Sequence, residues 1–180
     1  MEILGMSKPF ADRVAVVTGA GRGIGKAIAR RLVRGGAKVA VVSRNLESCT
    51  AAASELNEEH PEMAHPYALD VSDWDQVVTV CKQIVTELGV VSILVNNAGV
   101  TRDNLTMRMS SDDWDTVLDT NLKGSFHMAK ALQLSLMRKS GGRIVNISSV
   151  TGLMGKAGQV NYASSKAGMF GLTKSLAREL

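Results

Sequence analysis

The sequence predicts an α/β fold built on a doubly wound parallel sheet, with helices on both faces. Short runs rich in Val, Ile and Ala alternate with longer stretches whose apolar residues recur three and four positions apart. The short runs are apolar on both faces, as expected of strands covered on each side, and parallel neighbours need a crossover helix between them. No linker, repeat or low-complexity tract interrupts this alternation, so we expect one domain over residues 1–180.

The short apolar runs are the predicted strands, and a predicted helix follows each one. The strands are expected at Val14 to Thr18, Lys38 to Ser43, Ala64 to Leu69, Ile93 to Asn96 and Arg143 to Ile147. The helices are expected at Ile24 to Gly35, Leu46 to Glu59, Trp74 to Leu88, Ser111 to Arg138 and from Gln159 to the end. Ser72 and Asp75 resemble a capping box before the third helix, and Gly35 with Gly36 would stop the first.

Composition limits the class of protein. The 180 residues are 45% hydrophobic and 21% charged, and 21 bases against 17 acids give a net charge of +4. Because these bases are scattered along the chain, nucleic acid is not an expected partner. No run of 18 apolar residues is present to cross a bilayer, so no membrane partner is expected either.

Two distant cysteines, Cys49 and Cys81, form no disulfide framework and indicate a reducing compartment. We therefore expect a cytoplasmic protein. An organelle matrix is the alternative, because Met6 could be a second start site behind a short leader. The three histidines lack the spacing of metal ligands, so no metal is expected.

A glycine-rich turn follows the first predicted strand. It reads Thr18-Gly19-Ala20-Gly21-Arg22-Gly23-Ile24-Gly25 and opens the first helix. Glycines allow a positive φ and let a pyrophosphate approach the backbone, while the helix N-terminus offers free N–H groups and the positive end of its dipole. The motif predicts a dinucleotide site of the Rossmann type, and the alternative is a glycine-rich loop without a ligand.

The end of the second predicted strand indicates which dinucleotide binds. An NAD-selective sheet places an acidic residue there for the ribose 2′-hydroxyl, whereas this chain has Ser43 and Arg44. Arg22 and Arg44 could hold a 2′-phosphate from two sides through charge-assisted hydrogen bonds. We therefore expect NADP, in its reduced form NADPH, and the alternative is that both arginines are solvated surface residues.

Tyr162 and Lys166 are four residues apart in the last predicted helix and so lie on one face. Tyrosine alone exchanges protons poorly near neutral pH because its ordinary pKa is about 10, and a neighbouring ammonium group stabilises the phenolate. Ser148 and Ser149 follow the fifth strand, at the edge where ligands bind in such sheets. On chemistry alone either serine is a candidate, although alternation along a strand lets only one of them face the site.

Asn121 lies in an apolar stripe of the fourth predicted helix, and its amide is expected to be buried. The stripe consists of Trp114, Val117, Leu118, Leu122 and Ser125. A buried amide costs free energy unless its hydrogen bonds are made, so we expect a partner for it. A purely structural bond to the backbone of a neighbouring strand would satisfy this expectation.

Together these motifs resemble the short-chain dehydrogenase/reductase family over essentially the whole chain. The glycine motif has the family's T-G-x3-G-x-G form, and Asn96-Asn97-Ala98-Gly99 matches its N-N-A-G signature. The resemblance implies four catalytic residues. Ser149 would bind the substrate carbonyl, Tyr162 would donate the proton, Lys166 would bind the nicotinamide ribose, and Asn121 would hold a water molecule that passes protons to the lysine.

The resemblance also implies the remaining cofactor contacts. Asp70, with Val71, would meet the adenine amino group, although Asp70 could equally be an acidic residue at a helix N-terminus. Asn96 would instead tie strands together. The expected cofactor-binding residues are Thr18, Gly19, Gly21, Arg22, Gly23, Ile24, Gly25, Arg44, Asp70, Val71, Asn97, Ala98, Gly99, Tyr162 and Lys166.

Within the family, the segments Asn96 to Leu105, Met107 to Met109 and Ser175 to Glu179 are similar to 3-oxoacyl-(acyl-carrier-protein) reductases. This similarity implies NADPH-dependent reduction of a carrier-bound 3-oxoacyl thioester in fatty-acid synthesis, with acyl carrier protein as a partner. Two alternatives stay open. One is reduction of other carbonyls, such as sugars, steroids or xenobiotics, and the other is a catalytically silent nucleotide-binding fragment.

The family resemblance further implies seven strands and a homotetramer, whereas five strands are predicted here. We therefore expect a C-terminally truncated chain that lacks the family's lid over nicotinamide and substrate, with its fifth strand as an exposed edge. Arg138, Lys139 and Arg143 could form a basic patch toward the acidic carrier protein, or simply a solvated helix end.

Overall fold

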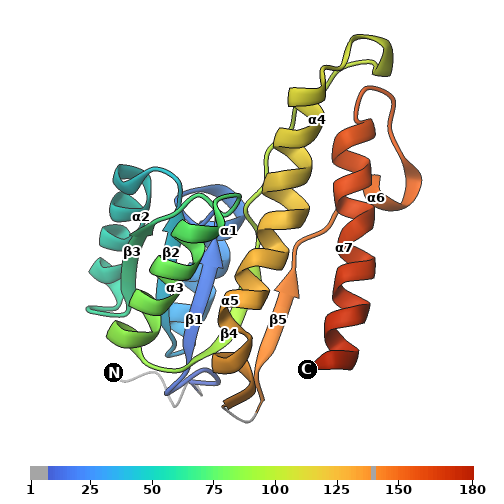
Figure 1. Ribbon diagram of the computed structural model, residues 1–180. Coiled ribbons are helices and arrows are strands. Elements are labelled where there is room, and N and C mark those ends of the chain that lie inside the picture. The colour runs from blue at the N-terminus through green and yellow to red at the C-terminus, as the bar shows by residue number, and fades with distance from the viewer. Residues whose placement is uncertain (1–7, 139–140) are drawn as a thin grey trace.

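The structure, a computed structural model, describes residues 8–138 and 141–180, so Met6 and Lys139 lie outside the described residues. Five parallel strands form one sheet in the order β3-β2-β1-β4-β5 (Figure 1). The strands are β1 (Val14–Thr18), β2 (Lys38–Ser43), β3 (Ala64–Ala68), β4 (Val91–Asn96) and β5 (Arg143–Asn146). The chain runs outward from β1 to β3 and then crosses to β4 on the other side, which confirms the doubly wound sheet.

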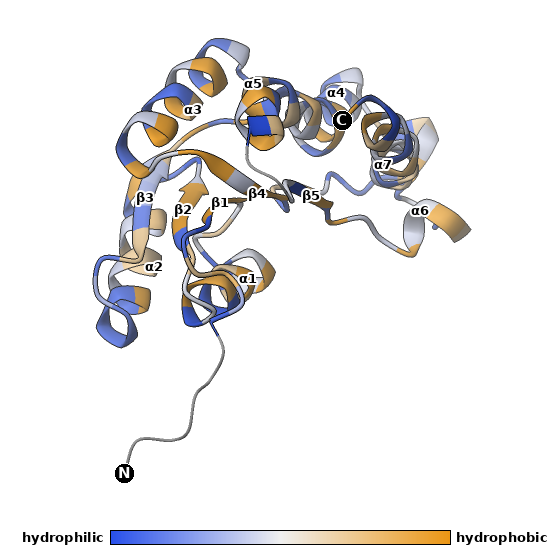
Figure 2. Cartoon of the chain, turned by 90° about the horizontal axis from the view of Figure 1, so that it is seen from below, coloured by the Kyte–Doolittle hydropathy of each residue, from blue (hydrophilic) through white to orange (hydrophobic). Residues whose placement is uncertain are grey.

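Helices cover both faces of this sheet, as Figure 2 shows. α1 (Gly23–Arg34) and α2 (Leu46–Glu59) lie on one face. The opposite face carries α3 (Trp74–Leu88), α4 (Ser111–Leu118), α5 (Gly124–Arg138) and α7 (Val160–Glu179), and the short α6 (Thr151–Met154) lies beside α7. No helix in the described segments is long and apolar enough to cross a membrane.

Alternate residues of the central strands feed two separate cores. In β1, Val14 and Val16 pack toward α3 and α5, whereas Ala15 and Val17 pack toward α1 and α2. Burial of one large aliphatic side chain contributes about 1.5–3 kcal/mol, and both cores contain many such side chains. Cys49 and Cys81 are buried free thiols, and burial raises the pKa of Cys81 to about 12.

The N-terminal cap of α3 differs from the one that the sequence pattern predicts. The predicted capping box before α3 is wrong: the N-cap is Asp73, whose carboxylate accepts from the Gln76 backbone N–H, while the Ser72 hydroxyl donates to Asp70. A complete capping box instead precedes α4, at Ser110 and Asp113.

The helix predicted from Ser111 to Arg138 is also divided. A π-helical turn, η2 (Asp119–Lys123), separates α4 from α5. The 3₁₀ turn η1 (Thr106–Arg108) and α6 had not been predicted. Both are shorter than the window in which apolar periodicity can be recognised.

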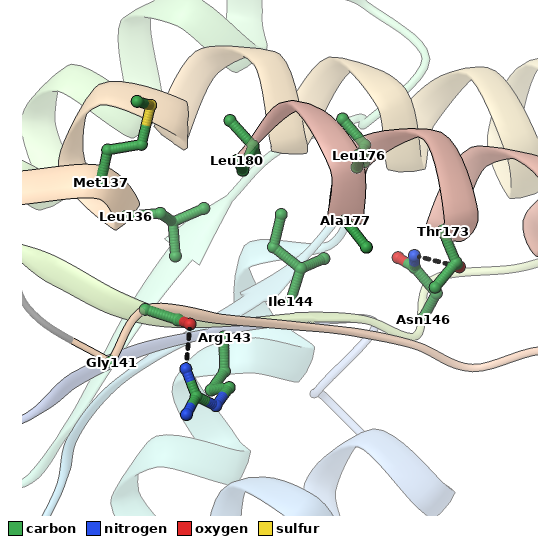
Figure 3. A pocket seen from close by; sticks show the side chains of 11 residues that line it. Leu136, Met137, Gly141, Arg143, Ile144, Asn146, Thr173, Leu176, Ala177 and Leu180 are labelled. Carbon is green, nitrogen blue, oxygen red and sulfur yellow. Dashed lines mark hydrogen bonds between the residues drawn. The ribbon is translucent and has the colours of Figure 1, made fainter.

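β5 has one neighbour in the described part of the chain, which is β4, and its other edge is open as expected. A pocket of about 490 Å³ lies between β5, the end of α5 and the C-terminal half of α7 (Figure 3). Ile144 and Leu176 point into it, and the Asn146 amide donates to the Thr173 hydroxyl (2.8 Å) at its border.

Candidate active site

The turn from β1 into α1 has the geometry of a phosphate-binding loop. Gly19 and Gly23 have φ angles of +65° and +57°, which residues other than glycine rarely adopt. A Cβ atom on Gly25 would lie 2.3 Å from the Gly19 carbonyl oxygen, so the helix can approach the strand only without a side chain there. A Cβ atom on Gly23 would meet nothing within 4 Å, and this side of the loop is therefore open to a ligand.

This loop forms one wall of a pocket of about 570 Å³ at the carboxyl ends of β1, β2 and β4. Its volume is in the range of small-molecule sites. Eleven of the fifteen expected cofactor residues line it, namely Gly19, Gly21, Arg22, Gly23, Ile24, Gly25, Arg44, Val71, Asn97, Ala98 and Gly99. The lining includes two arginines and no acidic residue.

Four of the expected residues do not line this pocket. Thr18 is buried beneath it and acts as a support, because its hydroxyl oxygen accepts from the backbone N–H groups of Asn97 and Ala98 (3.0 Å each). Asp70 lines an adjoining pocket, which Arg44 also borders. The remaining two, Tyr162 and Lys166, lie on α7.

The Asp70 carboxylate accepts hydrogen bonds from the Ser72 backbone N–H (2.9 Å) and hydroxyl (2.6 Å). It therefore braces the loop before α3, and since Asp73 is the N-cap, Asp70 does not cap that helix. Asn96 ties strands together as expected, since its amide donates to Asn146 on β5 (2.8 Å).

Tyr162 and Lys166 lie on one face of α7, and the Lys166 Nζ is 5.7 Å from the centre of the Tyr162 ring. Lys166 is only 5% exposed, and its Nζ donates to the Ile147 carbonyl oxygen (2.7 Å). Burial lowers the pKa of Lys166, because poorly solvated surroundings disfavour the charged ammonium.

Gly99 joins the dinucleotide pocket to these residues. It lines the pocket, and a Cβ atom at this position would lie 3.8 Å from the Lys166 Nζ and 3.2 Å from the Asn121 Oδ1. The Lys166 ammonium group and the Asn121 amide are thus next to the pocket, and the Tyr162 ring is the neighbour of that ammonium group.

The two candidate serines differ in what their hydroxyl groups do. Ser148 Oγ donates to the Lys166 carbonyl oxygen (2.7 Å), so its proton is committed to α7. Ser149 Oγ accepts from the Thr151 backbone N–H (3.2 Å) and keeps its own proton available. β5 ends at Asn146, so the expected strand alternation does not apply here, and the loop contacts alone favour Ser149.

Asn121 lies in the π-helical turn and is fully buried, as expected. Its Oδ1 accepts from the Val100 backbone N–H (2.8 Å), and its Nδ2 donates to the Val100 carbonyl (3.1 Å) and to Ser165 Oγ (3.1 Å). These bonds correspond to the structural alternative, although they reach the loop after β4 instead of a strand. A water-holding role for Asn121 stays a prediction.

Two buried polar residues beside the candidate catalytic groups had not been predicted. Asn161 and Ser165 are both fully buried on α7, and Ser165 Oγ donates to the Tyr162 carbonyl oxygen (2.8 Å). Their position on either side of Tyr162 was the available signal in the sequence. Among the described residues, no group of three or more His, Cys, Asp or Glu residues could hold a metal ion.

Comparisons with known proteins agree with this geometry. A family model described as short chain dehydrogenase matches residues 13–180. The chain is 48% identical to the 3-oxoacyl-(acyl-carrier-protein) reductase of Vibrio harveyi over 93% of its own length and 67% of that protein. Identity to the enzyme of the same name from Escherichia coli K12 is 44%, over 95% of this chain and 68% of the relative.

A crystal structure from Sinorhizobium meliloti 1021, provisionally assigned as a short-chain alcohol dehydrogenase, has the same fold. It superimposes with a TM-score of 0.90 at 37% identity, over 96% of this chain and 68% of the other. The part of the chain described above therefore corresponds to about two thirds of these proteins.

Proposed function

The chain belongs to the short chain dehydrogenase family, and from this premise we propose that it reduces a 3-oxoacyl thioester to the 3-hydroxyacyl form with NADPH. The observation that carries the proposal is the buried Lys166 ammonium, 5.7 Å from the Tyr162 ring and adjacent to Gly99 of the dinucleotide pocket. The names of relatives that are 44–48% identical support the thioester substrate. Oxidoreductase activity itself follows from family membership.

The proposed residues act on the carbonyl oxygen. NADPH, when bound, supplies a hydride to the ketone carbon. The Ser149 hydroxyl donates a hydrogen bond to the carbonyl oxygen and stabilises the negative charge that develops there. Tyr162 gives its phenolic proton to the same oxygen, which completes the alcohol, and Lys166 stabilises the phenolate that remains.

Lys166 also helps Tyr162 to recover its proton. Because burial lowers the pKa of Lys166, its ammonium group releases a proton more readily than an exposed lysine does. The Ile147 carbonyl holds the amine in place next to the ring. The proton taken up from solvent in each cycle balances the one delivered to the product.

The choice of NADPH over NADH is supported by the charges around the pocket. Arg22 and Arg44 are exposed at its border, and no acidic residue lines it to repel a 2′-phosphate. The acidic residues nearby, such as Asp112 and Asp115, line the adjoining pocket.

Partners and location stay predictions. Arg138 and Arg143 are exposed at the end of α5 and on β5, where a carrier protein could be bound, whereas the third base of that patch, Lys139, lies outside the described residues. A homotetramer and a cytoplasmic location are likewise expected from the resemblance and the cysteine content.

The proposal can be tested by following NADPH absorbance with an acetoacetyl thioester and then with simple ketones. We expect rapid oxidation of NADPH with the thioester and little with the ketones. Broad consumption would favour a general carbonyl reductase. Binding of NADPH without turnover would overturn the catalytic proposal.

A further inference from the structure

Asn161 precedes Tyr162 in the first turn of α7, and no part of it is exposed. Its Nδ2 donates to the carbonyl oxygens of Arg102 (2.9 Å) and Asp113 (3.2 Å), and its Oδ1 accepts from the Tyr162 backbone N–H (2.7 Å). Carbonyl oxygens only accept, so the two donors of the amide must face them. A buried amide is costly unless such bonds are made, and here each polar atom has a partner.

These bonds connect the proposed proton donor to two other parts of the molecule. Arg102 belongs to the loop that leaves β4 through Gly99, and Asp113 belongs to α4, which packs beside the start of α7 (Figure 1). Through these two bonds the Asn161 side chain connects the first turn of α7 both to the loop after β4 and to α4.

Two further contacts join the start of α7 to the loop after β4. The Gln159 amide donates to the Asp103 carboxylate (2.6 Å), and the Asn104 backbone N–H donates to the Gly158 carbonyl oxygen (2.9 Å). The Gln159 contact is exposed and so competes with water. Asn161 is fully buried, and so is the bond from Asn121 to Ser165, but among these contacts only the Asn161 side chain also bonds directly to the Tyr162 backbone N–H.

The Tyr162 hydroxyl depends on the backbone for its position. Among the described residues, the phenolic oxygen has no hydrogen-bond partner, and its ring has the Lys166 Nζ as neighbour at 5.7 Å. A small movement of the helix turn would therefore move the phenol relative to both Lys166 and Gly99.

We propose that Asn161 is a positioning residue, which fixes Tyr162 against the cofactor pocket by pinning the first turn of α7 to Arg102 and Asp113. This inference rests on the proposed function, in which Tyr162 donates the proton. In this role Asn161 touches neither substrate nor cofactor.

The test is Asn161→Asp in the full chain, which keeps the size of the side chain and removes both N–H donors. A displacement of about 1 Å near the reacting atoms can lower the rate about 100-fold, so kcat should fall about 10- to 100-fold. The KM for NADPH should stay near the parent value, because Asn161 does not line the dinucleotide pocket.

Two further readouts separate positioning from loss of folded protein. We expect the pH profile of kcat to shift and the solvent isotope effect on kcat to increase, because proton transfer from a misplaced phenol becomes slower relative to the other steps. A partly unfolded sample would lower kcat without changing either quantity, since the remaining native molecules react like the parent.

Asn57→Asp is the matched control. The Asn57 amide donates to the Ala64 carbonyl oxygen (2.8 Å) and accepts from the backbone N–H groups of Met63 (3.1 Å) and Ala64 (2.9 Å), so it joins α2 to β3, away from α7. The control loses the same kind of bond, and its pH profile and isotope effect should equal those of the parent.

Asn161→Ala replaces Asn161→Asp in these measurements if the buried carboxylate prevents folding. Loss of NADPH binding by Asn161→Asp will reveal that case. The proposal is overturned if a folded variant keeps the parental pH profile and isotope effect, whatever its kcat. It is also overturned if both variants lose NADPH binding, because the role of Asn161 would then be purely structural.

A separate measurement covers the case in which the parent reduces no ketone and the proposed function itself fails. The chain contains two tyrosines, so ¹³Cζ-tyrosine labelling gives two signals that Tyr67→Phe assigns. A change in the pH dependence of the Tyr162 signal in Asn161→Asp, absent from Asn57→Asp, supports the positioning role. An unchanged signal contradicts it.

Discussion

Replacing Arg44 with alanine is expected to weaken binding of NADPH much more than binding of NADH. Arg44 is exposed at the end of β2 and borders the dinucleotide pocket together with Arg22. A hydrogen bond to a charged group contributes about 1.5–3 kcal/mol, and solvent screening reduces this for an exposed side chain. We therefore expect a loss of about 1–2 kcal/mol, which raises the Kd for NADPH about 5- to 30-fold.

Isothermal titration of parent and variant with both dinucleotides measures this difference. The NADPH advantage should decrease as salt is added, since the Debye length is about 10 Å at 0.1 M. Arg31→Ala is the control, because Arg31 is an exposed arginine of α1 that does not border the pocket. Equal affinity of the parent for NADPH and NADH, or an unchanged Kd in Arg44→Ala, would refute the assignment.

Four further substitutions test other parts of the account. Tyr162→Phe should lower kcat by about 10²- to 10⁴-fold through loss of the general acid, with NADPH affinity retained in a titration, and a near-parental turnover would exclude Tyr162 as proton donor. Gly23→Ala should cost about 1–2 kcal/mol, since φ is +57° but the surrounding space is open. Gly25→Ala should destabilise the chain more, because the new Cβ atom would lie 2.3 Å from the Gly19 carbonyl oxygen; thermal unfolding that ranks the two glycine variants in the opposite order would contradict this geometry. The folded chain keeps the Cys81 thiol protonated, because its pKa rises from 9.0 to about 12. The contribution of this thiol to the free energy of unfolding is therefore complete below about pH 9 and declines above it by about 1.4 kcal/mol per pH unit. Urea titrations at several pH values should show a shallower decline of the free energy of unfolding in Cys81→Ala. Equal slopes for parent and variant would show that Cys81 does not cause the decline.

The sheet could be predicted closely because its strands are recognisable locally. β1 and β2 match the predicted ranges, since their aliphatic runs are buried on both faces and end at glycine or polar residues. β4 begins at Val91, two residues earlier than predicted. The polar Ser92 interrupts the apolar pattern in the sequence, although it is completely buried in the strand.

The glycine loop of the candidate site could be predicted, but the supports of the catalytic residues could not. The loop is recognisable because its four glycines lie within seven consecutive residues, from Gly19 to Gly25. The distant partners of Asn161 and Asn121 include the backbone groups of Arg102, Asp113 and Val100, which almost any residue type would offer at those positions. Only the tertiary arrangement brings them into contact with the amides.

The serines after β5 show the same limit at shorter range. Alternation along a strand predicts that only one of them faces the site, without saying which, but the strand ends at Asn146. The distinction between Ser148 and Ser149 comes from the Lys166 carbonyl oxygen, which lies 18 positions away in the chain and accepts from one of the two hydroxyl groups.

Deuterium transfer from NADPH that carries deuterium at both hydrogens of nicotinamide C4 tests the central claim most directly. The chain is incubated with an acetoacetyl thioester, and the mass of the product is measured for the parent and for Tyr162→Phe. The account predicts one deuterium on the carbinol carbon of the 3-hydroxyacyl product, formed rapidly by the parent and far more slowly by the variant. Product without deuterium, or equal rates for parent and variant, would contradict it.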